Sequence, residues 1–429
     1  MKITKTNFFP IFLPHKHAFV ILPEMREALL PCFKSIPTAE ASYNYALDFL
    51  AESYSKPNNY DTYRNDLIVF FCWAYANGKD VVDITRTDML AFIKFCNEPP
   101  RELQAKSARP VLIINKADED DLRINPEWRP FKNANPDKPY TRMESTVQKQ
   151  LSVLSSLFVY LNDVEHTTIN PAALALRRFN PKSMDGVALT EQKEKALSQL
   201  QLSAMFDTLD ELCIESENKL KAERARFLMY LLILAFPRRS EISATLRYSP
   251  LMSDFERVRV GDVVRYVFHI RKGKGSKSRK VLCSGLLIEA LKRYRLFLGQ
   301  SELPLPTDDS PLLVRLRAAP HGREAKVVDA CISDKQLAEV VKWVFEETAL
   351  RLDLMEEFEE AAHLRTLSAH SCRHTGISLA LSAGRKPELL LHDTGHSTMA
   401  SLMIYNSSRI EYRLGEVDKI DTVLMDYKL

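Results

Sequence analysis

The second half of the chain has arginines and lysines at positions from which they could bind a phosphate group. Arg238 and Arg239 follow Pro237, which should end a long apolar helix, so backbone on both sides would hold them. The strongly basic run 271–280 lies between two predicted strands and therefore forms a hairpin turn, where ammonium groups can contact phosphates. The ordinary alternatives are surface arginines near a helix cap and a solvated charged loop.

A histidine, an arginine and a tyrosine further along extend this chemistry. His370 and Arg373 are three residues apart at the start of a predicted helix, so they share one face. His396 and Tyr405 are nine residues apart, about 900° of rotation on one continuous helix, and would converge only if the chain bends. Gly395 as a C-cap and Ser397 as an N-cap offer that bend. Taken singly, the His370 and Arg373 pair is equally well explained by capping or surface residues, and Tyr405 is better explained as a core or surface tyrosine.

The composition indicates a folded globular protein. The chain has 429 residues, 45% hydrophobic and 27% charged, which predicts two or three domains. Its longest apolar run, 227–236, is shorter than the roughly 20 residues of a membrane span and predicts a buried helix. No signal peptide is visible. The seven scattered cysteines include no CxxC pair, which argues against a disulfide framework or zinc ribbon and favours a reducing compartment.

The charge is unevenly distributed. Residues 238–280 contain 12 Lys/Arg and 4 Asp/Glu, a balance of +8, while the whole chain carries +3, so the remainder sums to 3 − 8 = −5. A basic block in a mildly acidic chain is typical of a polyanion-binding surface, with a solvated charged face as the alternative.

The hydrophobic pattern predicts two domains of different class. Residues 1–40 show no clear period and are interpreted as an N-terminal extension. Residues 41–180 are predicted to be helical, interrupted by an insertion at about 98–140 with one short strand at 111–114. Residues 178–192 are a candidate linker. The second domain, 190–429, is predicted to combine helices with a small antiparallel sheet made of strands 258–260, 263–270 and 280–283.

The order of these signals resembles that of the tyrosine recombinase (phage integrase) family. Arginine, hairpin lysine, His-x-x-Arg, Gly-His and a tyrosine nine residues later follow one another over roughly residues 195–412. The helical residues 41–175 are similar to the family's core-binding, SAM-like domain in pattern only. The resemblance therefore implies a mainly α fold with a small antiparallel β-sheet, divided into a helical core-binding domain and an α+β catalytic domain with a C-terminal tail.

The resemblance also implies roles for individual residues. The implied catalytic set is Arg238, Lys274, His370, Arg373, His396 and Tyr405. The implied DNA-binding set is Arg239, Arg271, Lys272, Lys277 and Arg279, with Arg239 also the second choice for the first catalytic arginine. Asp393-Thr394 departs from the leucines that usually precede Gly-His. Tyr412 and Tyr427 are alternative nucleophiles by position but lack the nine-residue spacing.

Elementary chemistry is consistent with these roles. Two guanidiniums can stabilise the charge of a pentacoordinate phosphate, and a phenol with a pKa near 10 needs proton removal as it attacks. In the family His370 would be the base, Lys274 would protonate the leaving 5′-oxygen and His396 would hydrogen-bond the phosphate. The bond energy stays in a 3′-phosphotyrosyl link, so no cofactor and no metal are expected.

The sequence thus predicts a site-specific DNA recombinase of a mobile element, acting in the cytoplasm on the nucleoid and not at a membrane. The family implies a homotetramer on paired double-stranded DNA sites that exchanges strands through a Holliday junction, with accessory DNA-bending proteins as further candidate partners. A tail stripe at 417–427 would either dock on a neighbouring subunit or pack on its own domain. The alternatives are a type IB topoisomerase or resolvase activity, and a non-catalytic DNA-binding protein on the same scaffold.

Overall fold

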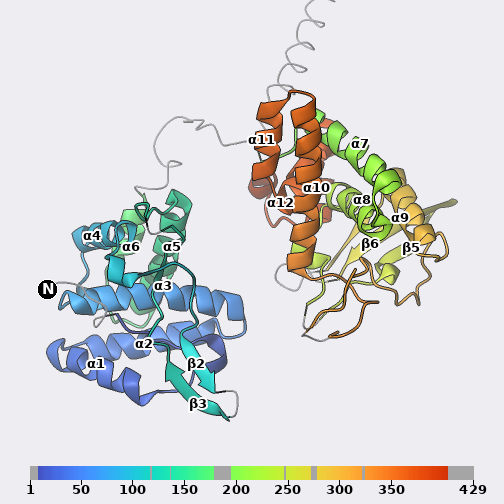
Figure 1. Ribbon diagram of the computed structural model, residues 1–429. Helices are drawn as coiled ribbons and strands as arrows, with labels where there is room; N and C mark the ends of the chain where they lie inside the picture. The colour runs from blue at the N-terminus through green and yellow to red at the C-terminus, as the bar shows by residue number, and fades with distance from the viewer. Residues whose placement is uncertain are drawn as a thin grey trace, which may run out of the picture. The chain divides into compact units, whose positions relative to one another are not determined.

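The chain divides into two compact units, residues 1–188 and 189–429 (Figure 1). The computed structural model describes residues 8–115, 118–135, 137–177, 195–245, 248–271, 278–320 and 324–403. Each unit has a main hydrophobic core of its own. All seven cysteines are free, and none of the described helices is long and apolar enough to cross a membrane.

Unit 1 is a helical bundle with an aromatic centre. Phe70 packs edge-on against Phe92 and Phe158, which come from three different helices. Thr85 caps the helix that follows it in a capping box with Asp88, and Gly78, at φ +69°, follows the end of the helix before it. The helices are α1 (Pro23–Ser35), α2 (Ala39–Glu52), α3 (Pro57–Ala76), α4 (Arg86–Asn97), α5 (Glu144–Asp163) and α6 (Pro171–Leu176).

The first 40 residues are not a separate extension, which corrects the prediction from the sequence. They contain α1, and Phe8, Ile11 and Phe12 are buried in the core of unit 1. The Phe12 ring stacks on Tyr43 at 5.1 Å between centroids. Prolines interrupt the apolar residues of this segment, so no helical or strand period is visible although the side chains are core residues.

The insertion at 98–140 adds two small sheets to unit 1. Strand β1 (Gln104–Ala105) pairs in parallel with β4 (Phe131–Lys132), and β2 (Leu112–Asn115) pairs antiparallel with β3 (Asp118–Ile124). The predicted strand at 111–114 is confirmed as β2. Its partner β3 escaped prediction because it begins with acidic residues, which are rare in strands.

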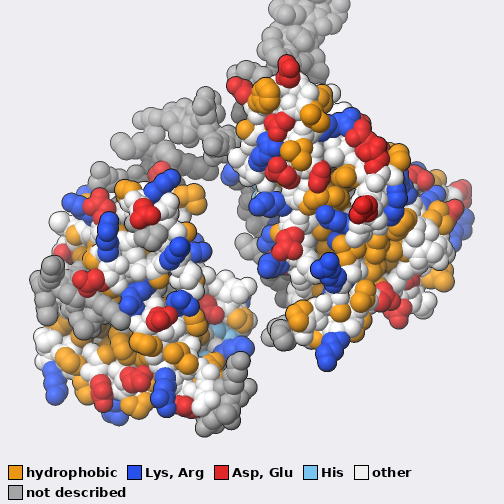
Figure 2. All heavy atoms as spheres, viewed as in Figure 1, with side chains coloured by type: hydrophobic (Ala, Val, Ile, Leu, Met, Phe, Trp, Pro, Cys, Tyr) orange, Lys and Arg blue, Asp and Glu red, His pale blue; other side chains and the backbone are white. Residues whose placement is uncertain are grey.

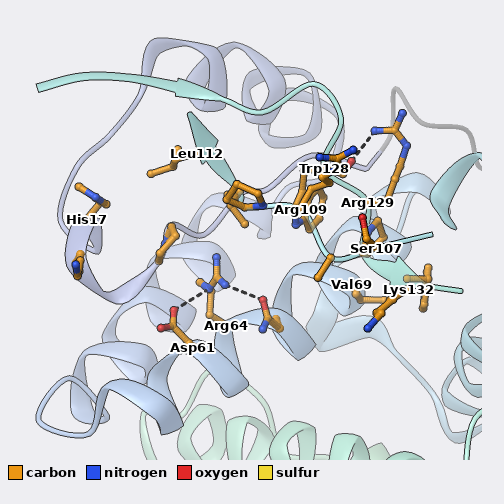
Figure 3. A pocket seen from close by; sticks show the side chains of 18 of the residues that line it. His17, Asp61, Arg64, Val69, Ser107, Arg109, Leu112, Trp128, Arg129 and Lys132 are labelled. Carbon is orange, nitrogen blue, oxygen red and sulfur yellow. Dashed lines mark hydrogen bonds and ion pairs between the residues drawn. The ribbon is translucent and has the colours of Figure 1, made fainter. Parts of the chain in front are cut away.

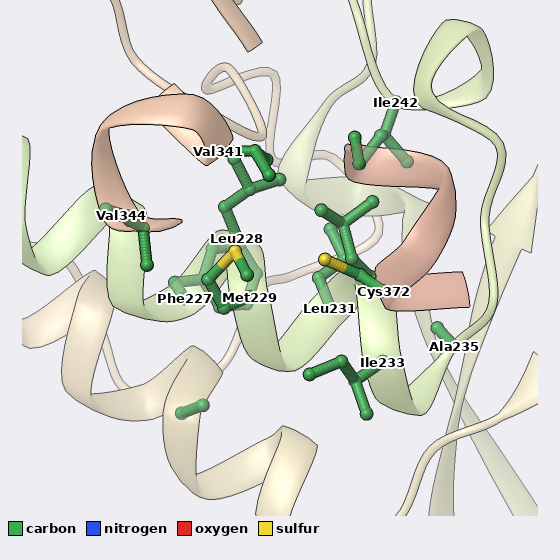
Figure 4. Packing of buried hydrophobic residues seen from close by; sticks show 14 of the residues in the cluster. Phe227, Leu228, Met229, Leu231, Ile233, Ala235, Ile242, Val341, Val344 and Cys372 are labelled. Atoms are coloured by element: carbon green, nitrogen blue, oxygen red, sulfur yellow. The ribbon is translucent and has the colours of Figure 1, made fainter. Parts of the chain in front are cut away.

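Unit 2 is built around helix α8 (Lys219–Leu234), which is buried on nearly all sides. Phe227, Leu228 and Leu231 are at most 1% exposed, and they pack among side chains from α10 and α12 (Figure 4). The helix packs against α7, α9 and α12. The buried helix predicted from the apolar run is therefore confirmed. Around α8 lie α7 (Gln199–Glu215), α9 (Gly285–Phe297), α10 (Asp334–Leu354), α11 (Phe358–Thr366), α12 (Ala369–Ser382), α13 (Pro387–Thr394) and α14 (Met399–Met403).

The three-stranded antiparallel sheet of unit 2 confirms the predicted one. Its order is β5-β6-β7, with β5 at Phe255–Val260, β6 at Val263–Ile270 and β7 at Arg279–Leu282. Phe268 on the central strand is registered with Phe255 on one side and Val281 on the other, and all three are buried. This register fixes the position at which β7 begins, within the basic run 271–280. With its helical majority and small sheet, the molecule has the predicted fold class.

On the face shown in Figure 2, Lys and Arg side chains are interspersed with Asp and Glu on both units. Several described cations of residues 238–280 are held in ion pairs. Arg271 and Lys280 pair with Glu256, and Arg238 and Arg279 pair with Glu241.

Candidate active site

The end of α8 sets the position of Arg238. The helix stops at Leu234, and Phe236 then adopts a left-handed backbone with φ +53°, a conformation that costs a non-glycine residue free energy and is often found at functional sites. Arg238 follows at the start of the short 3-10 helix η7 (Arg239–Glu241). Its backbone N–H donates to Glu241 Oε2 at 2.7 Å and its Nη1 donates to Glu241 Oε1 at 3.0 Å.

Arg373 on α12 is 1% exposed and reaches two chain segments. Its Nη1 donates to the Phe236 carbonyl, and its Nη2 donates to the Thr394 carbonyl at 2.6 Å. The same Nη2 lies 3.5 Å from His396 Nε2. Arg373 therefore joins the end of α8 to the segment after α13, and it fixes the distance between Arg238 and His396.

His396 leaves α13 through a sharp turn. Gly395 has φ +65°, the left-handed C-cap predicted from the sequence. Its carbonyl lies 3.5 Å from Arg238 Nη2. The Thr394 hydroxyl contacts His396 Nδ1 at 2.8 Å, which orients the ring. The next cap is Thr398, whose hydroxyl accepts from the Ser401 N–H, so the assignment of Ser397 as N-cap was wrong by one residue.

Arg279 and Glu241 connect the sheet to both of these segments. Glu241 accepts a fork of two hydrogen bonds from Arg279, at 3.0 and 2.7 Å, in addition to those from Arg238. The Nε of Arg279 donates to the Asp393 carbonyl at 2.7 Å. The Arg279 side chain is only 10% exposed. Although the sequence analysis placed Arg279 among residues that contact DNA, its guanidinium is used inside the site.

The electrostatic field of this cluster keeps the histidines neutral. Burial, then the charges of Arg373 and Arg238, lower the pKa of His370. The same causes lower the pKa of His396 to about 4. Burial alone would raise the pKa of Glu241, but its contacts with Arg279 and Arg238 outweigh burial, and the pKa is lowered. The site thus combines an ionised Glu241, three guanidiniums and two neutral imidazoles, which suits an anion with a proton to exchange.

Four of the six predicted catalytic residues converge in the described structure: Arg238, His370, Arg373 and His396. Arg239 pairs through its Nε with Asp334 Oδ1 at 2.7 Å, and both side chains are 43% exposed. Arg239 and Asp334 line one pocket together with His370.

The remaining predicted site residues lie in the sheet or outside the description. Arg271 pairs with Asp254 and lies 3.6 Å from Glu256. Lys272, Lys274, Lys277 and Tyr405 lie outside the described residues. So does the tail stripe at 417–427.

The sequence analysis missed three contributors to this site. Thr394 holds the His396 ring, although it was noted only as a departure from leucine. Lys195, at the start of unit 2, contributes to lowering the pKa of His370 and of His374. Phe236 supplies the carbonyl that Arg373 binds. No short-range sequence signal marks the last two, since both act through contacts across the fold.

Comparison with known sequences gives one curated relative. The chain is 24% identical over 284 residues to the tyrosine recombinase XerC of Thermodesulfovibrio yellowstonii, covering 65% of this chain and 76% of that one. No family model matches the chain. The resemblance to tyrosine recombinases derived from the motifs is confirmed by this relative.

Solved structures with a related arrangement belong to the same group. The XerH site-specific recombinase bound to palindromic difH substrate matches with 13% identity and a TM-score of 0.49, covering 98% of both chains. The Tn1549 transposon integrase with circular intermediate DNA matches with 12% identity and a TM-score of 0.47, over 87% and 98% of the chains. A lambda integrase dimer on a COC' core site matches with 11% identity and a TM-score of 0.44, over 86% and 96%. At these scores the likenesses carry no argument about activity.

Proposed function

We propose that this chain is a tyrosine recombinase, an enzyme that cuts and rejoins DNA strands through a covalent protein–DNA intermediate. The observation that carries the proposal is the convergence of Arg238, Arg373, His370 and His396 on one site. Fixed guanidiniums stabilise the charge that grows on the phosphate oxygens in the transition state, and a neutral imidazole can take up a proton.

In the proposed step the phenolic oxygen of Tyr405 attacks the scissile phosphorus. A 3′-phosphotyrosyl bond forms as the bond between phosphorus and the 5′-oxygen breaks. His370 takes the phenolic proton, and Lys274 donates a proton to the 5′-oxygen, so that a free 5′-hydroxyl leaves. His396 contacts the phosphate, while the Thr394 hydroxyl contacts its Nδ1 and orients the ring. Religation by another 5′-hydroxyl reverses these steps.

The biological setting of this activity follows from the family. The chain would act in the cytoplasm as a tetramer on two double-stranded DNA sites, exchange strands through a Holliday junction and serve a mobile genetic element, with or without DNA-bending accessory proteins. Residues 190–429 would be the catalytic domain and residues before about 180 the core-binding domain. Relaxation of supercoiled DNA without sequence preference would instead favour a type IB topoisomerase.

Covalent trapping in cells tests the proposal. The wild-type chain and Tyr405→Phe are isolated under denaturing conditions, and any attached DNA is sequenced. We expect attachment at a few related sequences in the wild type and none in Tyr405→Phe, because phenylalanine has no nucleophilic oxygen. Tyr412→Phe and Tyr427→Phe are matched controls that should attach DNA like the wild type.

Each other outcome has a defined meaning. Attachment that persists in Tyr405→Phe but disappears in Tyr412→Phe or Tyr427→Phe would move the nucleophile to that tyrosine. Binding of the same DNA sites without attachment in any variant would favour a non-catalytic DNA-binding protein.

A further inference from the structure

A solvent-open pocket of about 630 Å³ lies in unit 1, remote in sequence from the residues of the candidate active site (Figure 3). Its walls come from the segment before α1, from α3 and from the insertion at 98–140. The volume is in the range of small-molecule sites in proteins. Apolar side chains such as Val69, Leu112 and Phe131 form much of its lining.

The charged groups around this pocket are strongly unbalanced. Asp61 is the one acidic residue among those that line it. The cationic lining residues are Lys16, Arg64, Arg109, Arg129 and Lys132. Arg109 is 3.6 Å from Glu127, and the Arg129 Nη1 donates to backbone carbonyls. An anion is therefore the charge type that this pocket attracts.

Arg64 lies at the centre of the pocket and is 5% exposed. Its Nη2 donates to Asn65 Oδ1 at 2.8 Å, and its Nε is 3.4 Å from Asp61 Oδ1. Neither Nε nor Nη1 makes a hydrogen bond within the described part of the chain. Figure 3 shows the guanidinium directed from α3 toward the space between His17 and Arg109. Burial lowers the pKa of this arginine, which reflects the cost of an incompletely compensated charge.

Arg315 shows what a structural buried arginine looks like in the same chain. It is 6% exposed, and all three of its nitrogens are engaged, Nε by the Cys331 carbonyl and the other two by Glu324. Arg64 lacks such a set of acceptors. Among the described residues, Arg64 has two buried nitrogens without a hydrogen bond, whereas other arginines have one each, such as Arg142, Arg224 and Arg295. Since buried guanidiniums normally have their hydrogen bonds satisfied, this larger shortfall at Arg64 calls for an acceptor from outside the chain.

We propose that this pocket binds a small organic oxyanion, a phosphate monoester or carboxylate with an apolar body, whose anionic head is held by Arg64. The apolar walls accept the body of the compound, and Lys16 and Lys132, both exposed, attract it from solution. A DNA backbone phosphate is a poorer occupant, because the receiving guanidinium is nearly closed to solvent and the walls are apolar. The insertion at 98–140 supplies much of the pocket, so the site is specific to chains that carry it.

Phenyl phosphate is a suitable probe because it combines a phosphate with an apolar ring. It is titrated into the full-length chain by calorimetry, at constant ionic strength. Trp128 in the pocket wall serves as a local reporter, and its emission is taken as the part of the tryptophan fluorescence that Trp128→Phe removes, because Trp73 and Trp343 also emit. We expect saturable binding with a change in Trp128 emission. Arg64→Met should weaken that binding about 10- to 100-fold, the usual effect of losing a charged hydrogen bond. Arg26→Gln, an exposed change on α1, should leave it unaltered.

The variant Arg238→Gln distinguishes probe binding in this pocket from probe binding at the candidate active site of unit 2. Phenyl phosphate should still change Trp128 emission in that variant, whether or not the recombinase activity proposed above is correct. An unchanged Trp128 signal in wild type at any probe concentration would overturn the inference. Competition by excess duplex DNA for the Trp128 signal would overturn the assignment to a small compound and give the site to a DNA phosphate.

Stability measurements separate a binding role of Arg64 from a structural one. Arg64→Met replaces an incompletely paired buried charge with an apolar side chain of similar length, so it should unfold at the same urea concentration as wild type or a higher one. Arg315→Met should unfold at a clearly lower one. If Arg64→Met lowered the urea midpoint of unfolding as much as Arg315→Met does, Arg64 would have a structural role, and the proposal would be contradicted.

Discussion

Arg238 is held in place by a carboxylate that a second arginine also binds. Glu241 is 3% exposed and accepts hydrogen bonds from Arg238 and Arg279. A lone buried carboxylate beside Arg238 would neutralise it, whereas with Arg279 present the three groups sum to one positive charge. Arg279 thereby leaves Arg238 available to an anion while it fixes the Asp393 carbonyl next to the His396 turn. It is a positioning residue, because its contacts are to protein groups.

Removing Arg279 should damage both stability and strand cleavage. We expect Arg279→Gln to lower the free energy of unfolding by about 3 kcal/mol, since it leaves buried Glu241 with a single charged partner. Arg279→Lys should restore only part of this, because an ammonium cannot make the two-point fork to a carboxylate. Urea unfolding measures the first effect, and the yield of covalent protein–DNA complex measures the second.

Arg239→Gln is the matched control for this prediction. Its ion pair with Asp334 is exposed on both sides, so the change should cost less than about 1 kcal/mol. Equal losses for the two variants would contradict the role assigned to Arg279.

At the scale of elements, the site depends on how closely α12 approaches α8. A Cβ on Gly376 would lie 1.9 Å from the Ile233 carbonyl oxygen and 3.0 Å from the Phe236 ring. Gly376 is therefore the contact point of the two helices, one turn after Arg373. The close approach is what allows Arg373 to reach the Phe236 carbonyl.

Gly376→Ala should separate these helices. Because the Ile233 carbonyl is backbone, it cannot rotate away, and we expect a loss of about 3 kcal/mol in the free energy of unfolding, together with a reduced yield of covalent complex. Gly285→Ala is the control, since a Cβ there meets no atom within 4 Å. Thermal and urea unfolding of both variants, compared with wild type, measures the effect. Equally small losses of unfolding free energy in Gly376→Ala and Gly285→Ala would contradict this packing argument.

Prediction from the sequence succeeded where local chemistry determines structure. Strand β6 was predicted with its observed bounds, and Gly395 was predicted as a C-cap. Helix α1 was missed because Pro31 lies inside it and its apolar residues bury against partners far along the chain. The fork between Arg279 and Glu241 spans 38 residues, so no local pattern could reveal it. The roles of Lys274 and Tyr405 stay predictions.

At the scale of the whole molecule, the two units contain half-buried groups that titrate with opposite effect. In unit 1, burial raises the pKa of Asp66 to about 6 despite Lys149 and Arg142. In unit 2, burial and neighbouring cationic groups lower the pKa of His374 and His396 to about 4. Each unit has a main core of its own, so these groups act on separate stabilities.

The signs follow from linkage. The stability that Asp66 provides is complete below its unfolded pKa of about 4 and is lost as pH rises through about 6. The stability that the two histidines provide is complete above their unfolded pKa of about 6.5 and is lost as pH falls through about 4. Between pH 4.5 and 7, the balance should therefore shift in favour of unit 2 as pH rises.

Hydrogen exchange of the full-length chain, followed by mass spectrometry, can read each unit separately. As pH rises from 4.5 to 7, and after correction for the intrinsic exchange rate, protection should increase in α8 and α12 relative to α3 and α5. Asp66→Asn should remove the loss of protection that unit 1 shows as pH rises, since the amide does not ionise. His374→Gln should reduce the gain of protection that unit 2 shows over the same range. Because each substitution lies in one unit, a change of pH dependence in the opposite unit would show that the two cores do not unfold separately.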